Sequence, residues 1–180
     1  MKFLKFMAVV GFQSVMAASA WADSHGNHGQ QGHHASKPMS GEMVQQMPVA
    51  ENVKAENCWL RLLPGSAPSA GYFLLHNNRS ESVVVVAAVA DAFDDVMVHQ
   101  TRHENGLSRM AMVSEVPVAA GGQLEFKPGS YHLMLEKANR PVQVGDLVEV
   151  SIVLKSNERV VASCEVKPAG TLKHSAGMSH

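Results

Sequence analysis

The chain has 180 residues, of which 46% are hydrophobic and 17% charged, and its formal net charge is -1 with ten histidines counted as neutral. This length supports one domain with a hydrophobic core, and the near-neutral charge argues against a nucleic-acid-binding protein, because neutralising phosphates requires a basic surface. The 11 methionines and 10 histidines are many for this length, whereas the two cysteines are too few for a disulfide scaffold or a four-thiolate zinc site. Thioethers and imidazoles are ligands of transition metals, so the composition favours a metal-binding protein.

Residues 1–22 have the pattern of a secretory signal peptide. Two lysines precede an apolar run over residues 6–18, and the small-x-small sequence Ala20-Trp21-Ala22 follows. The alternative is a membrane anchor, but the run is shorter than the roughly 20 apolar residues that a span requires. We therefore predict cleavage after Ala22, export to the periplasm, and no membrane span in the mature chain.

Residues 23–50 are predicted to be a disordered leader, because they are rich in Gly, Ser, Gln and His and lack apolar periodicity. Cleavage after Ala22 would make His25 the third residue of a free amino terminus, which can chelate Cu(II) in a square plane of nitrogen ligands. A plain solvated linker is the alternative. Residues 168–180 form a second tail that contains His and Met. The candidate Cu(II) ligands of the two tails are His25, His28, His33, His34, His174, Met178 and His180.

Residues 51–167 are predicted to form an all-β domain. Short β-branched runs alternate with turn sequences such as PGSAP, HNNRS, HENG and AAGG. About nine strands without a helical period predict an antiparallel sandwich or a small Greek-key barrel. The predicted strands are 58–63, 70–76, 82–90, 95–100, 108–113, 123–126, 131–136, 147–154 and 160–166.

Three of these strands each carry two Met or His residues at positions i and i+2, which project from the same face of a strand. The pairs are Met97/His99, Met110/Met112 and His132/Met134. Thioethers are soft ligands that favour Cu(I), imidazole accepts either copper oxidation state, and thioethers resist an oxidising compartment better than thiols do. The pairs predict a soft metal site. The alternative is that the methionines fill the core and the histidines lie on the surface.

His99, Met110, His132 and Met134 follow the pattern H-x10-M-x21-H-x-M, which resembles the signature of the periplasmic PCu(A)C copper chaperones. The segments AGYFLLHNN, KPGSYHLMLEK and RPVQVGDLVEVSIVL are similar to that family as well, so the resemblance covers roughly residues 57–166. It implies a cupredoxin-like Greek-key barrel or sandwich that holds Cu(I) near one surface through these four side chains. Met97 and Met112 add thioethers that could share in this ligand set or exchange with it.

The resemblance also implies a function. Members of the family deliver copper toward the Cu(A) centre of cytochrome c oxidase, so the implied partners are a copper acceptor such as the Cu(A) subunit or a Sco-like protein with a thioredoxin fold. A second function left open by the sequence is periplasmic copper buffering or resistance, with Cu(II) bound by the tails. A copper oxygenase would need cleavage between Ser24 and His25, and an adhesion sandwich would leave the Met/His pairs unexplained.

The two cysteines, Cys58 and Cys164, lie on apolar faces of the first and last predicted strands. We prefer a buried disulfide because the predicted compartment is oxidising, and two free buried thiols or a thiol near copper are the alternatives. Neither cysteine lies in the signature, which disfavours a blue-copper electron-transfer site, because that site requires a Cys thiolate.

The other polar residues carry no recognisable chemistry. No nucleophile elbow, P-loop or paired-carboxylate motif is visible, and we expect no enzymatic activity. His76 and His103 fall in predicted turns and are expected to be solvated.

Overall fold

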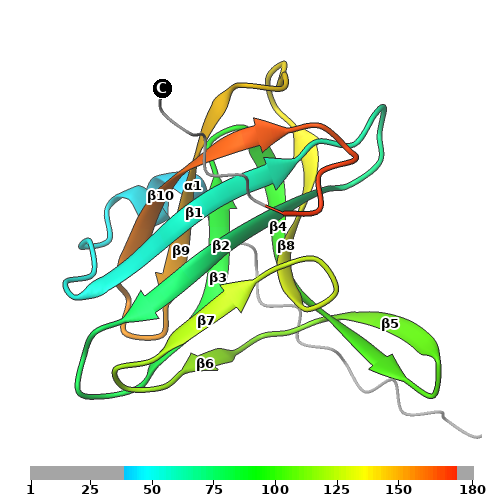
Figure 1. Cartoon of the computed structure of the whole chain (residues 1–180). Helices are drawn as coiled ribbons and strands as arrows, with labels where there is room; N and C mark the ends of the chain where they lie inside the picture. Colours follow the sequence, from blue (N-terminus) through cyan, green and yellow to red (C-terminus); the bar gives the residue numbers. More distant parts are fainter. Residues whose placement is uncertain (1–38, 174–180) are drawn as a thin grey trace, which may run out of the picture. The chain divides into compact units, whose positions relative to one another are not determined.

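The computed structural model describes residues 39–173, which contain one short helix and ten strands (Figure 1). Nine of these strands correspond to the predicted ones, and the all-β prediction is confirmed. The three-residue strand β6 was not predicted, because its sequence, Val-Pro-Val, is too short to show a period. The elements are α1 (Gly41–Gln45), β1 (Val53–Arg61), β2 (Ser69–Asn77), β3 (Val83–Ala90), β4 (Phe93–Glu104), β5 (Leu107–Met112), β6 (Val116–Val118), β7 (Gln123–Phe126), β8 (Tyr131–Ala138), β9 (Leu147–Leu154) and β10 (Arg159–Lys167).

The strands close into a barrel. Their order in the sheet is β5-β4-β8-β2-β1-β10-β9-β3-β6, and an additional pairing of β4 with β3, at Ala90 and Phe93, joins seven of them in a ring. Strands β5, β6 and β7 extend the sheet outside the ring. The strands of the described residues pair antiparallel, as predicted, except that β1 and β10 run parallel, with Trp59 opposite Glu165. No hairpin joins these two strands, so the turn sequences could not give their relative direction.

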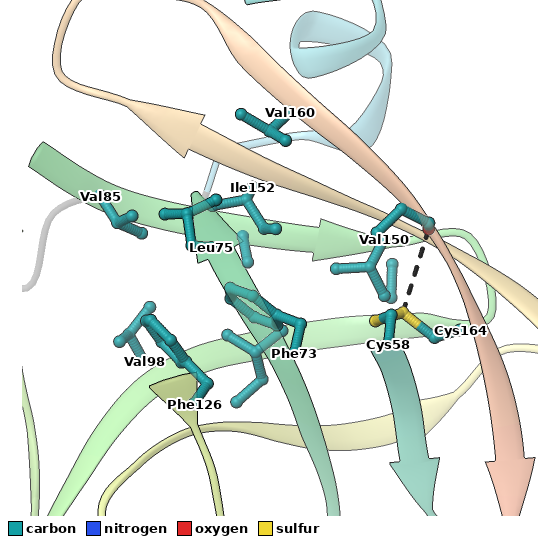
Figure 2. Packing of buried hydrophobic residues seen from close by; sticks show 14 of the residues in the cluster. Cys58, Phe73, Leu75, Val85, Val98, Phe126, Val150, Ile152, Val160 and Cys164 are labelled. Atoms are coloured by element: carbon teal, nitrogen blue, oxygen red, sulfur yellow. Dashed lines mark hydrogen bonds between the residues drawn. A yellow bond between two sulfur atoms is a disulfide. The ribbon is translucent and has the colours of Figure 1, made fainter. Parts of the chain in front are cut away.

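The core fills the barrel with side chains of alternate strand positions (Figure 2). Phe73 of β2 stacks on Phe126 of β7 with ring centroids 4.3 Å apart, and the labelled valine, leucine and isoleucine side chains surround this pair. Burial of a large apolar side chain contributes about 1.5–3 kcal/mol of stability, so this cluster is the main source of stability.

Cys58 and Cys164 form a disulfide between β1 and β10, with their Cα atoms 4.4 Å apart (Figure 2). The bond lies in the core beside Val150, and Cys164 is fully buried. Of the three alternatives for the cysteines, the structure therefore has the buried disulfide. It joins the first strand of the barrel to the last across 106 positions of sequence.

The predicted leader, residues 23–50, overlaps the described chain at residues 39–50, where the chain forms α1 and contacts the barrel. The Ser40 hydroxyl caps α1 by accepting a hydrogen bond from the Met43 N–H, and the Val44 side chain is fully buried. The Ala50 N–H donates to the carbonyl of Arg159 at 2.8 Å, which attaches this segment to β10. One helical turn with a single buried residue has no detectable period, so periodicity could not predict it.

No helix within residues 39–173 has the length and apolar character needed to cross a bilayer.

Candidate metal centre

The three Met/His pairs lie on one face of the sheet. In the pairing of β4 with β8, Met97 is opposite Met134 and His99 is opposite His132. In the pairing of β4 with β5, His99 is opposite Met112 and Thr101 is opposite Met110. Directly paired residues project from the same face, so the structure brings together all six predicted side chains. The six are Met97, His99, Met110, Met112, His132 and Met134.

The β4–β5 hairpin extends beyond the barrel (Figure 1), and Met110 and Met112 lie on its second strand. Its two-residue turn, Asn105-Gly106, has positive φ at both positions, as a type I′ turn requires. Strand β5 is an edge strand whose six residues are all exposed, and within the described residues it pairs with β4 alone. Met110 and Met112 are therefore reachable from solvent, while the other four side chains come from strands inside the sheet.

The imidazole of His132 is held with one nitrogen free for a ligand. Its Nδ1 atom lies 3.0 Å from the carbonyl oxygen of Ser130, and since a carbonyl oxygen only accepts, Nδ1 carries the proton. In the neutral ring Nε2 then presents a lone pair, and this atom lies 3.1 Å from the Met110 sulfur. Two lone-pair donors thus face each other, which is an arrangement that a cation between them would stabilise.

The loop that precedes β8 fixes this geometry. The Ser130 carbonyl that binds His132 also accepts a hydrogen bond from the Thr101 N–H at 3.0 Å. One carbonyl therefore sets the orientation of the His132 ring and its distance from β4. A hydrogen bond from the second ring nitrogen to a carbonyl oxygen commonly orients a metal-binding histidine.

His99 supplies a second unpaired nitrogen. Its ring lies edge-on to that of His132, with centroids 5.9 Å apart, and its buried Nδ1 atom has no hydrogen-bond partner among the described residues. Burial, and secondly the neighbouring His132, lower the pKa of His99, although Glu136 opposes the shift. The ring is therefore neutral at neutral pH, and neutral imidazole is the form that binds metal.

Exposure increases from the histidines to the methionines of β5. His99 and His132 are each 8% exposed, Met110 is 56% exposed and Met112 63%. Metal–nitrogen and metal–sulfur bonds of about 2.0 and 2.3 Å, as for zinc, place the two atoms about 3.5 Å apart in a tetrahedral site. The His132–Met110 contact would have to open by a few tenths of an ångström, which the exposed Met110 side chain allows.

An aromatic wall adjoins the site on the same face. Tyr72 of β2 has its ring centroid 6.4 Å from that of His132 and 4.4 Å from that of Trp59. The Arg61 guanidinium lies 5.5 Å above the Tyr72 ring, and burial raises the pKa of Tyr72. Tyr72 was not predicted as a neighbour of the site, although its strand parity, opposite to that of the core residue Phe73, indicates that it lies on the outer face.

Other predicted residues are placed as follows. His103 is not in a turn but within β4, on the same face as His99, and its Nδ1 lies 2.8 Å from the Ser108 hydroxyl oxygen. His76 lies in β2, with Nε2 3.4 Å from a Glu56 carboxylate oxygen.

Within residues 39–173 no three His, Cys, Asp or Glu side chains gather to hold a metal ion, so the candidate site depends on its methionines. The tail residues His25, His28, His33, His34, His174, Met178 and His180 lie outside the described residues.

A family described as "Putative lipoprotein LpqE-like" matches residues 53–166, from the start of β1 to the penultimate residue of β10. Among curated proteins, an uncharacterized protein of Rickettsia prowazekii is 30% identical over 100 residues, covering 54% of this chain and 55% of its own length. A "Putative lipoprotein" of Leifsonia xyli subsp. xyli is 28% identical over 104 residues, covering 57% of this chain and 62% of its own length. The chain thus spans little more than half the length of these relatives.

Solved structures resemble the described domain. The apo PCuAC domain of PmoF2 gives a TM-score of 0.57 at 20% identity and covers 70% of this chain and 98% of its own. The apo PCuAC domain of PmoF1 gives 0.55 at 21% identity, and the copper-bound PCuAC domain of PmoF2 gives 0.54 at 19%; they cover 68% of this chain and 98% and 97% of their own. The fold predicted from the sequence resemblance, that of a PCuAC domain, is confirmed.

Proposed function

Since this chain belongs to the LpqE-like family and has the fold of PCuAC domains, we propose that it is a copper chaperone that binds one Cu(I) ion and passes it to an acceptor protein. The observation that carries the proposal is the contact of 3.1 Å between Nε2 of His132 and the Met110 sulfur, in a ring whose Nδ1 faces the Ser130 carbonyl. An imidazole nitrogen and a thioether sulfur that converge in this way are a ligand pair that suits a soft monovalent cation. That one structural neighbour is described as a copper-bound PCuAC domain supports the choice of metal.

The proposed ligands are His99, Met110, His132 and Met134. The rings of His99 and His132 lie side by side, and the Met110 sulfur contacts His132. Met134 lies two residues after His132 on the same face of β8. All four are uncharged, so a bound Cu(I) keeps a net charge of +1. A charged ion on neutral ligands is held less firmly than one on thiolates, which suits a carrier that must release its cargo.

A position at the sheet surface supports transfer in preference to permanent storage. Met110 stands on an exposed edge strand, and an acceptor ligand can approach the ion from that side. A structural metal site is closed by four protein ligands and shields its ion. The most specific acceptor we propose is the Cu(A) centre of cytochrome c oxidase, reached directly or through a Sco-like protein with a thioredoxin fold.

Export to the periplasm is part of the proposal. Residues 1–22 have the composition of a signal peptide, and the Cys58–Cys164 disulfide suits an oxidising compartment. The matching family and one relative are described as lipoproteins, which supports export as well.

The tails are proposed to bind Cu(II) separately from the barrel. Nitrogen-rich termini suit Cu(II), whereas the Met/His face suits Cu(I). If the tails supplied most of the binding, copper buffering would be the better description of the function. Spin resonance of Cu(II) on the mature chain and on a chain that begins at Met39 separates the two, because the shorter chain keeps α1 and the barrel but loses the N-terminal histidines.

The deciding experiment measures Cu(I) in two steps. The mature protein is titrated anaerobically with Cu(I) against a chromophoric chelator, and the loaded protein is then mixed with an apo Cu(A) domain. We expect one tightly held Cu(I) per barrel and transfer to the Cu(A) domain within minutes. Tight binding without transfer to any Cu(A) or Sco-like acceptor would favour buffering, and absence of Cu(I) binding would refute the proposal.

A further inference from the structure

We propose that Met112 is the exit ligand, the thioether onto which Cu(I) moves before an acceptor takes it. The inference rests on the proposed function and adds a direction of release to it. Met112 lies outside the four proposed ligands, yet it stands in register with one of them, His99, on the neighbouring strand.

The register places Met112 within reach of the ion without movement of the backbone. His99 has His132 opposite it on β8 and Met112 opposite it on β5. The Cβ atoms of directly paired residues are about 4.5–5.5 Å apart. An ion bound to His99 lies between the two side chains, so the flexible side chain of Met112 has to span only part of that distance to reach it. An ion bound at His99 therefore has a thioether on each flank of the β4 strand, Met134 on the interior side and Met112 on the edge side.

The two thioethers that the signature does not include differ in access. Met97 pairs with Met134 on two interior strands and is half-buried. Met112 is 63% exposed and lies at the end of an edge strand that no other described strand covers. Of these two side chains only Met112 can contact the ion and an incoming protein at the same time.

The surface around Met112 suits a protein acceptor. Met110, two positions earlier on the same face of β5, is also an exposed large apolar side chain, and neighbouring exposed apolar side chains can mark a surface that contacts another protein. The outer edge of β5 pairs with no strand within residues 39–173. The acceptor therefore approaches from the β5 side, where Met112 is the more exposed of the two methionines.

The transfer step conserves charge and electrons. The Met112 sulfur donates a lone pair to Cu(I) as the bond from Cu(I) to the Met134 sulfur breaks, and copper stays in the +1 state. An acceptor thiolate or imidazole then adds to the ion, the bonds to His99, His132 and Met110 break, and the bond to the Met112 sulfur breaks last, as a second acceptor ligand replaces it. The exchange of ligands on this chain requires no oxidant, reductant, acid or base.

The test compares Met112→Leu with Met97→Leu in the full mature chain, each loaded with one Cu(I). Release is followed by stopped-flow mixing with bicinchoninate, a Cu(I) chelator, and with an apo Cu(A) domain. For Met112→Leu we expect an unchanged Kd, within about threefold, and release slowed by about tenfold or more, as for the loss of one ligand from the transition state. Met97→Leu should release Cu(I) at the wild-type rate, and thermal melts verify that both variants fold.

Three results would overturn the inference. Release from Met112→Leu at the wild-type rate, with Cu(I) still tightly bound, would refute the exit role and leave the proposed function intact. A Kd weakened by tenfold or more would make Met112 a resident ligand instead. An equal slowing in Met97→Leu would show that the effect does not depend on the edge position. Failure of the wild-type chain to bind Cu(I) would instead refute the proposed function itself.

Discussion

The Nε2 atom of His132 and the sulfur of Met110 lie 3.1 Å apart, although 22 positions of sequence separate the two residues. The β4–β5 hairpin makes this contact possible, because it turns Met110 back over the face on which His132 lies. The histidine is buried and the methionine is exposed. Replacement of Met110 should therefore affect the stability of the fold less than replacement of His132.

Replacement of a proposed ligand should weaken Cu(I) binding. Loss of an outer-shell partner of a metal site costs about 10–100-fold in affinity, so we expect at least about 100-fold for His132→Ala and about tenfold or more for Met110→Leu. Competitive titration with a chelator gives both values. Met43→Leu is the matched control, because Met43 is 56% exposed, like Met110, but lies on α1 outside the site. X-ray absorption without sulfur scattering from the bound Cu(I) would contradict the ligand set.

The affinity for Cu(I) should depend on pH through the histidines. Protonation removes the lone pair of imidazole, whereas thioethers do not titrate in this range. Because the pKa of His99 is lowered from 6.5, protons compete with copper at His99 only at pH values below 6.5. We expect constant affinity between about pH 7 and 8 and weakening below about pH 6. The same dependence should persist, at lower affinity, in Met110→Leu. A flat profile from about pH 5 to 8 would show that the histidines do not bind the ion.

The ion pair between Arg79 and Glu158 should give the protein stability that acid removes. Two hydrogen bonds of 2.8 and 2.7 Å from the Arg79 guanidinium, followed by one from Ser156, lower the pKa of Glu158 from 4.5 to about 2. A carboxylate with a lowered folded-state pKa stabilises fully above its unfolded pKa, and this contribution is lost as pH falls from about 4.5 through about 2. Thermal melts of Glu158→Gln should show a lower Tm at pH 7 and a weaker dependence on pH between 4.5 and 2. Glu115→Gln, which removes an exposed pair with Lys155, is the control and should change Tm little.

The disulfide should contribute much of the stability of the barrel. In the chain-entropy description, closing a loop of this length stabilises a fold by about 4–5 kcal/mol. The double variant Cys58→Ala/Cys164→Ala should lose about that amount in denaturant unfolding, yet bind Cu(I) with the same stoichiometry when folded, because the bond lies in the core and not on the metal-site face. A loss below about 1 kcal/mol would mean that the unfolded chain is already constrained by other means.

The short helix should be part of the folded domain. Val44 is fully buried, so Val44→Ala should cost about 2 kcal/mol through lost burial and a residual cavity. Val49→Ala is the control, because the Val49 side chain is 57% exposed. Denaturant unfolding measures both variants. An equal and small effect would show that α1 contributes no stability, and a chain starting at Pro48 would then serve as well as one starting at Met39.

Local pattern and spacing predicted the barrel strands and the shared face of the Met/His pairs. The i, i+2 rule needs no knowledge of the partner strand, so it placed His99 beside Met97 and His132 beside Met134 correctly on their strands. The register that sets His99 opposite both His132 and Met112 depends on strand pairing over long sequence distances, and periodicity does not contain it. The parallel pairing of β1 with β10 could not be predicted for the same reason. Strand β4 also continues to Glu104, beyond its predicted end at residue 100, so His103 lies in the strand and not in the turn.

Along β4 and β8, residues that pack the core alternate with residues of the metal-site face. Val98, Leu133 and Leu135 point into the core, while the neighbouring His99, His132 and Met134 belong to the metal-site face. A substitution can therefore alter copper affinity or exit rate with little effect on packing, and a core substitution can change stability while the ligands keep their places. Natural variation can accordingly adjust the two properties at different positions. Relatives could share this barrel while holding their cargo more or less firmly, according to which thioethers each of them keeps on the outer face.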